Sequence, residues 1–372
     1  MFDAERIAAE FCEFVRIPSI SAREKAMAEE LRERLQAVGL PTWYDDAQRL
    51  VDGEIGNLWS RIDATAGGKP TILLNAHMDT VTPGEDIEPH RDGERLCSLG
   101  DTILAADDKT GVAEILAVVR EIVANPFPHG DILVCFTIAE ETGLNGAKGI
   151  DYDSFSADCA LVMDGGRTIG QICVGAPSAT RMVYEIAGVA AHAGVRPEAG
   201  VSAIRAASTA IAGMRLGRID EQTTSNIGII EGGRAPNIIP ASCRCVGEAR
   251  SHDEDKLMRQ VDHMRRCFEE ACYAVGATLS VDEVSSYRAF FLPNEHPLVA
   301  AAMAVATELG HEPQPVRGGG GSDANVFNEH GIPAIIMPTG SADPHTLEES
   351  VNVEDMGRSA DYLLAVIKKL QG

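Results

Sequence analysis

The chain has 372 residues, of which 45% are hydrophobic and 24% charged, a composition typical of globular proteins with room for two domains. Its 56 acidic residues outnumber 32 basic ones, and the formal net charge of −24 would repel phosphate backbones and anionic lipid. We therefore expect neither a nucleic-acid partner nor a membrane partner. No segment approaches the ~18–20 consecutive apolar residues that span a bilayer.

The N-terminal segment and the cysteines indicate a cellular location. Residues 1–20 are amphipathic and acidic, unlike a signal peptide. The nine cysteines are scattered and contain no CxxC pair. We expect a cytoplasmic, reducing environment.

The first 175 or so residues alternate helical and strand patterns. Helical spacing is found at 3–17, 24–38 and 112–125, and strand patterns at 58–63, 71–77, 131–139 and 159–164. The last two strands are nearly continuous apolar runs, as expected for strands buried on both faces of a sheet. This order predicts an α/β fold, with a mixed, largely parallel sheet between layers of helices.

Near residue 177 the pattern changes to β-α-β-β-α-β, the order of a ferredoxin-like α+β domain. Its elements are expected at 180–190, 201–214, 223–233, 242–251, 253–276 and 277–287. The α/β character then resumes, with a helix at 296–310, a strand at 333–340 and a helix at 353–370. We expect a discontinuous domain, 1–177 and 288–372, and an inserted domain, 178–287.

Acidic and histidine side chains follow several of these strands. They are His77 and Asp79 in LLNAHMDT, Asp107 in LAADDKTG, Glu140 and Glu141 in CFTIAEETG, Asp164 in ALVMDGG, and His345 in DPHTLEE. The carboxyl ends of parallel strands meet at one edge of a sheet, so these side chains are expected to converge. Two histidines and several carboxylates suit a pair of divalent metal ions.

Each residue also has a simpler interpretation. Asp79 lies two positions after His77, so both face one side of a strand, but Asp79 could instead cap the turn that follows this strand. Asp107 could bridge two metals or belong to the acidic N-cap and first turn of a helix. Glu140 and Glu141 repel each other unless a cation or solvent compensates, and a solvated loop tip is the alternative.

The remaining two candidates are weaker when taken alone. Asp164 precedes two glycines and could form an ordinary turn, and His345 lies in a polar loop where exposure is the default. The combination and order of the motifs are therefore more specific than any one of them.

The ordered motifs HMD, AADDKTG, AEETG, MDGG and PHT resemble those of the co-catalytic zinc exopeptidases, which include peptidase T, carboxypeptidase G, aminoacylase and succinyl-diaminopimelate desuccinylase. The resemblance extends over nearly the whole chain, through GVAAHAG, GGRAPNIIP and GEARSHDEDKL to GGGGSDANVFNEHGIP. The DDK and DGG motifs and the last of these segments are most similar to the peptidase T branch.

This resemblance implies a hydrolase with two Zn²⁺ ions per subunit. One zinc would be held by His77, Asp107 and Asp164, and the other by Glu141, Asp107 and His345. Asp79 would orient His77, and Glu140 would be the general base.

The family further implies a homodimer formed through the inserted domain. His192 would reach the partner's active site and stabilise the oxyanion, while Asn237 and Arg250 would bind substrate. Gly320 and Gly321, in the run from Gly318 to Ser322, would line the pocket with backbone amides. A phosphate-binding loop is the rival interpretation of this run, but no GK[ST] follows it.

The substrate expected from the peptidase T resemblance is a tripeptide that loses its N-terminal residue. N-acyl amino acids, dipeptides and peptides with C-terminal glutamate remain alternatives, because Arg250 would suit any free carboxylate. Two rivals belong to other classes: a metal-binding relative without turnover, and a two-metal phosphoesterase. Glu140 argues against the first, and the motif order against the second.

Overall fold

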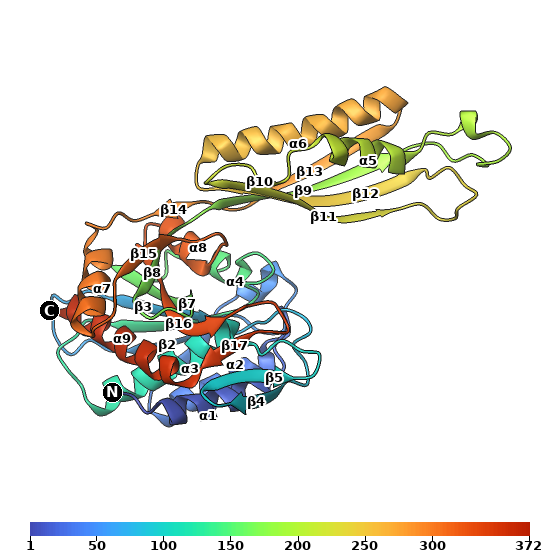
Figure 1. Cartoon of the computed structure of the whole chain (residues 1–372). Helices are drawn as coiled ribbons and strands as arrows, with labels where there is room; N and C mark the ends of the chain where they lie inside the picture. Colours follow the sequence, from blue (N-terminus) through green and yellow to red (C-terminus); the bar gives the residue numbers. More distant parts are fainter. The chain divides into compact units, whose positions relative to one another are not determined.

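The computed structural model describes residues 1–372 and divides into two compact units. The first consists of Met1–Ala176 and Phe291–Gly372, and the second of Pro177–Phe290. Figure 1 shows the elements of both units in the colours of the sequence. No helix has the length and apolar character needed to cross a membrane.

Strands of the first unit come from both of its chain segments. They are β1 Thr42–Tyr44, β2 Leu58–Ile62, β3 Ile72–His77, β4 Glu88–Asp92, β5 Arg95–Leu99, β6 Ile132–Thr137, β7 Cys159–Gly166, β8 Gln171–Ala176, β15 Gln314–Arg317, β16 Ala334–Ala342 and β17 Ser350–Asn352, with β14 Phe290–Phe291 at the unit boundary. The helices are α1 Ala4–Val15, α2 Lys25–Ala37, α3 Ala106–Ala124, α4 Asn145–Lys148, α7 Pro297–Glu308, α8 Asp323–Glu329 and α9 Val353–Gln371, with a 3₁₀ turn η1 at Ala47–Leu50.

The main path of the large sheet has the order β1-β2-β6-β3-β7-β16-β17-β5-β4. The four central strands β6, β3, β7 and β16 are parallel, whereas the outer strands pair antiparallel. The predicted mixed sheet between helices is therefore confirmed. The register pairs His77 at the end of β3 with Thr137 at the end of β6, so their carboxyl ends lie level at one edge.

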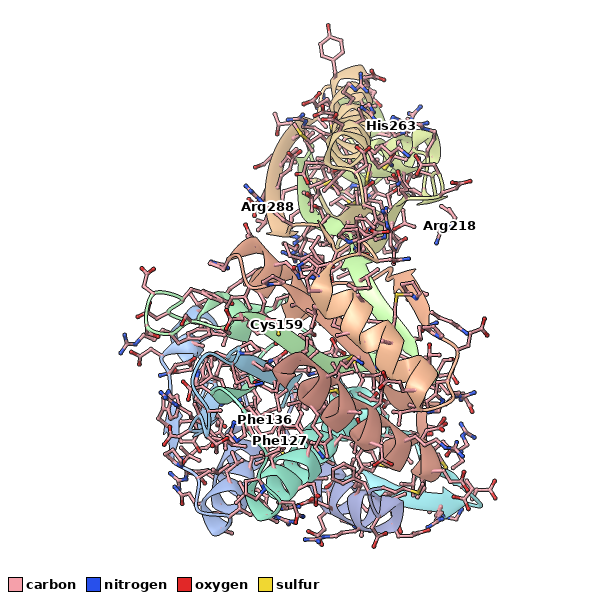
Figure 2. The ribbon with its side chains drawn as sticks, turned by 90° about the vertical axis from the view of Figure 1, so that its left-hand side faces the viewer. Phe127, Phe136, Cys159, Arg218, His263 and Arg288 are labelled. Atoms are coloured by element: carbon pink, nitrogen blue, oxygen red, sulfur yellow. The ribbon has the colours of Figure 1, made fainter.

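Apolar side chains on both faces explain why the central strands form. Every residue of β3 and β6 is buried. Ile72, Leu74 and Ala76 belong to the same core cluster as the apolar faces of α1, α3 and α9. In Figure 1, α4 and α8 lie on the other side of the sheet. Figure 2 labels Phe136 of β6 and Cys159 of β7, both buried.

Apart from the additional short elements η2 and β10, the second unit has the predicted β-α-β-β-α-β order. Its elements are β9 Ser178–Ala187, η2 Pro197–Ala199, α5 Ala203–Gly213, β10 Gly217–Arg218, β11 Thr223–Gly232, β12 Ser242–Ser251, α6 Glu254–Val275 and β13 Thr278–Tyr287. The sheet order is β10-β11-β12-β9-β13, and all its pairs are antiparallel. Helices α5 and α6 cover one face (Figure 1), where Tyr184 and Phe268 stack with ring centroids 3.9 Å apart.

Several short elements were not predicted. The hairpin of β4 and β5 is largely exposed, and β4 has the polar sequence EPHRD, without the apolar alternation that indicates a strand. The short strands β8, β15 and β17 also escaped prediction. Strand β17 matters for the site, because it pairs with both β16 and β5 and thereby closes the loop that carries His345.

Candidate metal centre

The candidate residues of the first unit come together at the carboxyl ends of the central strands. His77 is the last residue of β3, Asp164 lies within β7, and Glu140 and Glu141 follow β6. Donor atoms lie within 4.8 Å of one another in each of three groups. These groups are His77 with Asp107 and Asp164, His77 with Glu140 and Glu141, and Asp107 with Glu141 and His345.

Asp107 lies between the two histidines. Its Oδ1 is 3.0 Å from Nε2 of His77, and its Oδ2 is 3.3 Å from Nε2 of His345. Nε2 of His345 is also 2.8 Å from Oε1 of Glu141. One carboxylate thus presents a separate oxygen to each imidazole, which is the arrangement of a bridging ligand.

The donor atoms of the two histidines and their neighbours fit divalent cations. Nδ1 of His77 is 2.9 Å from the backbone carbonyl oxygen of Asp79, which can only accept, so Nδ1 carries a hydrogen. In a neutral His77, Nε2 then presents a lone pair to an Asp107 oxygen. At His345, one Nε2 faces oxygens of both Asp107 and Glu141. Divalent metals can compensate several such acceptors at once.

Burial makes this concentration of acids unfavourable without cations. Burial raises the pKa of Glu140 well above its ordinary value, and the negative charge of Asp164 adds to the effect. The pKa of Asp164 is raised by burial and by Asp107. Burial also raises the pKa of Asp107, but hydrogen bonds with His345 and His77 outweigh it and bring that pKa below its ordinary value. Hydrogen bonds with Asp107 and Glu141 raise the pKa of His345 to about 10.

Asp79 connects the end of β3 to the loop that carries the two glutamates. Its Oδ1 accepts the backbone N–H of Glu140 at 2.9 Å, and its Oδ2 accepts that of Glu141 at 3.2 Å. The hydroxyl of Ser21 donates to Oδ2 at 2.6 Å. Oδ1 also lies 3.5 Å from Nδ1 of His77. Asp79 therefore contacts the histidine, as one interpretation held, but the turn that it caps is the one after β6 and not the turn that follows β3.

Only part of the helix interpretation of the aspartate pair holds: both residues lie in the first turn of α3, but neither is its N-cap. The N-cap position of α3 is Ala105, and no side chain caps it. Asp107 and Asp108 have non-helical backbone angles. Oδ2 of Asp108 instead accepts the backbone N–H of His77 at 3.1 Å, which attaches the start of α3 to the end of β3.

The loop-tip interpretation of Glu140 and Glu141 is also wrong. Glu140 is only 8% exposed, and the Glu141 side chain is exposed to the same extent. His345 has a half-exposed side chain, but its Nε2 faces the cluster.

Three further buried carboxylates lie around the cluster and were missed in the sequence. Glu349 accepts three backbone N–H groups from the segment before and at Asp107, and Glu24 accepts those of Ala22 and Ala139. Asp323 accepts hydrogen bonds from Thr137 and Asn75. For two of them the available signal was the position near recognised motifs, since Glu349 follows PHT and Asp323 follows the glycine run.

Three predicted residues lie in the second unit. His192 and Asn237 occupy exposed loops that pair with each other, since Ala193 N donates to the Asn237 carbonyl oxygen at 2.9 Å and His192 forms a bridge with Ile238. Arg250 is near the end of β12, where its Nε and Nη2 each contact Glu248 at 3.0 Å. In the first unit, Gly320 and Gly321 lie in the loop between β15 and α8.

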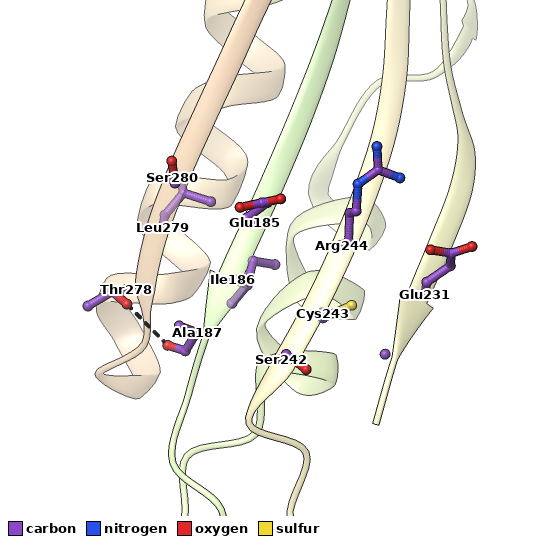
Figure 3. Close-up of a pocket in the computed structure, with 11 residues that line it drawn as sticks. Glu185, Ile186, Ala187, Glu231, Ser242, Cys243, Arg244, Thr278, Leu279 and Ser280 are labelled. Carbon is purple, nitrogen blue, oxygen red and sulfur yellow. Dashed lines mark hydrogen bonds between the residues drawn. The ribbon is translucent and has the colours of Figure 1, made fainter. Parts of the chain in front are cut away.

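A small pocket of about 90 Å³ opens at the cluster. It is lined by Asp107, Asp108, Asp164, Gly165, Gly166, Thr339, Ser341 and Pro344. A larger hollow of about 550 Å³ lies on the second unit, where Arg244 stands between Glu185 and Glu231 on neighbouring strands (Figure 3). None of the residues that line this hollow belongs to the three candidate metal groups.

A parallel-centred α/β sheet whose strand ends gather two histidines and several buried carboxylates defines a metal-dependent hydrolase. Over residues 73–369 the sequence matches the profile of Peptidase family M20/M25/M40, and the chain belongs to this family. The predicted resemblance to the exopeptidases, and the prediction of an enzyme, are thereby confirmed.

Known proteins resemble the chain over its full length. Uncharacterized protein YqjE of Bacillus subtilis is 35% identical over 369 residues, which are 99% of each chain. The structure of aminopeptidase PepT from Bacillus cereus has a TM-score of 0.88 and 36% identity, covering 100% of this chain and 99% of its own. A tripeptidase from Staphylococcus aureus has a TM-score of 0.93 and 35% identity, with the same coverage.

Proposed function

We propose that the protein is a two-zinc aminopeptidase that removes the N-terminal residue of tripeptides. The observation that carries this proposal is the position of Asp107 between His77 and His345, in a cluster that also contains Glu140. The substrate class is supported by whole-length identity of 35–36% to a tripeptidase and an aminopeptidase.

The proposed ligands follow the two groups that share Asp107. His77 and Asp164 would join Asp107 on one zinc, and Glu141 and His345 would join it on the other. When bound, the ions would supply Lewis-acid chemistry, lowering the pKa of the attacking water and polarising the scissile carbonyl.

Glu140 would transfer a proton from the attacking water to the leaving amine. As general base it would accept a proton from the attacking water and then donate it to the amine nitrogen as the C–N bond breaks. Asp79, which accepts the backbone N–H of Glu140, would hold this group in place and orient His77.

The second unit would serve as the dimerisation and lid domain, corresponding to the inserted domain expected at 178–287. His192 of a partner subunit would stabilise the oxyanion. Asn237 and Arg250 would bind the substrate, with the guanidinium of Arg250 pairing with its carboxylate. Gly320 and Gly321 would contribute backbone amides. A homodimer and a cytoplasmic location belong to the same proposal, and the latter is supported by nine cysteines that are all free thiols.

The test is cleavage of four substrates: a tripeptide, a dipeptide, an N-acyl amino acid and a peptide with C-terminal glutamate. Chelated and zinc-restored samples are assayed in parallel. We expect preferential tripeptide cleavage that chelation removes and zinc restores. Preference for another substrate would make the protein a different amidohydrolase with the same centre. Two bound zinc ions without turnover on any substrate would contradict the proposed activity and favour a silent metal-binding relative.

A further inference from the structure

The carboxylate of Glu349 binds the backbone that leads into Asp107. Its Oε2 accepts the N–H groups of Leu104 and Ala105, each at 2.8 Å, and its Oε1 accepts that of Asp107 at 2.9 Å. Glu349 is 1% exposed, so these bonds are shielded from water. A single side chain thus satisfies three backbone donors within four consecutive residues.

The segment needs such an acceptor because its backbone is irregular. Ala105 has a left-handed φ of 62°, and Asp107 has φ −86° and ψ 102°, outside the helical region. The first N–H groups of a helix have no intrahelical partner, and buried donors must find one elsewhere. The Glu349 carboxylate supplies it, and the orientation of the Asp107 side chain follows from the backbone so fixed.

Glu349 also belongs to the loop that carries His345. The loop runs from the end of β16 to the start of β17, which pairs with β16 and β5. Within it, Thr346 Oγ1 donates to the Asp343 carbonyl oxygen at 2.8 Å, and Glu349 N donates to the Thr346 carbonyl oxygen at 3.2 Å. Glu349 therefore joins the backbone segments that present Asp107 and His345, whose side chains approach to 3.3 Å.

We infer that Glu349 is a positioning residue for the metal centre, holding the backbone of residues 104–107 so that the Asp107 carboxylate stays between His77 and His345. This inference rests on the proposed two-zinc function. Glu349 is not one of the proposed ligands, and it acts through Asp107. Groups of this kind, one step removed from the metal, commonly change metal affinity by ~10–100-fold when they are replaced.

The test is a calorimetric titration of Zn²⁺ into the metal-free full-length protein, with Co²⁺ absorption spectra recorded on the same samples. In Glu349→Gln, the carboxamide nitrogen replaces one acceptor with a donor that opposes the backbone N–H groups. We expect a folded variant whose affinity for at least one zinc falls ~10–100-fold, with a changed Co²⁺ spectrum. The matched control is Glu348→Gln, an exposed neighbour in the same loop, which should behave like the wild type.

If Glu349→Gln does not fold, a second variant still tests the inference. Glu349→Asp keeps the charge and shortens the side chain by one carbon, so it should fold and show a smaller loss of zinc affinity with an altered spectrum. Native zinc affinity and an unchanged spectrum in a folded Glu349 variant would overturn the inference, whatever happens to thermal stability. A wild type that binds fewer than two zinc ions would overturn the proposed function, and the inference with it.

Discussion

The carboxylate of Asp79 accepts the backbone N–H of Glu140 at 2.9 Å, although the residues are 61 positions apart in the sequence. The contact connects the end of β3 to the turn after β6. Because His77 is at the same strand end, one side chain links a proposed metal ligand to the proposed general base. The two groups are thus held by the same hydrogen-bond network.

Asp79→Asn is expected to reduce turnover ~10–100-fold while leaving the fold intact. The asparagine nitrogen is a donor and would oppose the N–H of Glu140, that of Glu141 or the hydroxyl of Ser21. The measurement is kcat on the best tripeptide, with zinc content determined in parallel. Asp63→Asn, at an exposed position, is the control. Unchanged turnover in Asp79→Asn would show that this network does not position the site.

Glu140→Gln should lower kcat by ~10²–10⁴-fold, because the amide cannot accept the proton from water. Zinc content should stay near that of the wild type, since the two ligand groups that share Asp107 do not include Glu140. The companion variant Glu141→Gln should lose zinc as well as activity. The assignment of Glu140 as general base would fail if its glutamine variant turned over at a near-normal rate.

The central sheet could be predicted because a strand that is buried on both faces has a nearly continuous run of apolar residues in the sequence. The apolar runs at β3 and β6 gave both the strands and the residues at their ends, including His77. The hairpin of β4 and β5 could not be predicted, because most of its side chains are exposed and follow no apolar pattern. Its place in the sheet depends on pairing with β17, more than 250 residues later.

The proposed ligands could be recognised because they follow strands and form an ordered series of motifs. The buried carboxylates that support these ligands, Glu349 and Glu24, could not be recognised in the sequence. Glu349 bonds Asp107 across 242 positions, and Glu24 bonds Ala139 across 115. No local sequence pattern indicates such contacts, and a glutamate in a sequence normally indicates exposed surface. Only the folded chain shows that these two are buried acceptors.

Glu24 is expected to make stability depend on pH. Burial, assisted by the charge of Asp79, raises its pKa from the ordinary 4.5 to about 7. The folded state therefore holds this proton more tightly than the unfolded chain. The resulting stabilisation is fully present below pH 4.5 and is lost as the pH rises through 7.

This contribution can be isolated with Glu24→Gln, which does not titrate. In chelator, the unfolding free energy of the wild type relative to the variant should fall by roughly 2–3 kcal/mol between about pH 5 and pH 8. Urea unfolding at both pH values measures the difference. Glu33→Gln, on the exposed face of α2, should show no comparable change. A difference that is constant with pH would refute the raised pKa of Glu24.

Gly111 allows the start of α3 to approach β7, and Gly111→Ala tests how much the metal centre depends on that approach. A Cβ at this position would lie 2.0 Å from the carbonyl oxygen of Met163 and 2.5 Å from Oδ1 of Asp108. Because Met163 precedes Asp164 and Asp108 follows Asp107, relief of the clash would move two proposed ligands apart. We expect a loss of about 1–3 kcal/mol in the free energy of unfolding and weaker zinc binding.

The control for this substitution is Gly67→Ala, where an added Cβ would meet nothing within 4 Å. It should leave zinc affinity unchanged and stability equal or slightly higher, because alanine restricts the unfolded chain. Urea unfolding and zinc titration of both variants give the comparison. If Gly111→Ala lost stability but bound zinc normally, the contact between α3 and β7 would support the fold without setting the distance between Asp107 and Asp164.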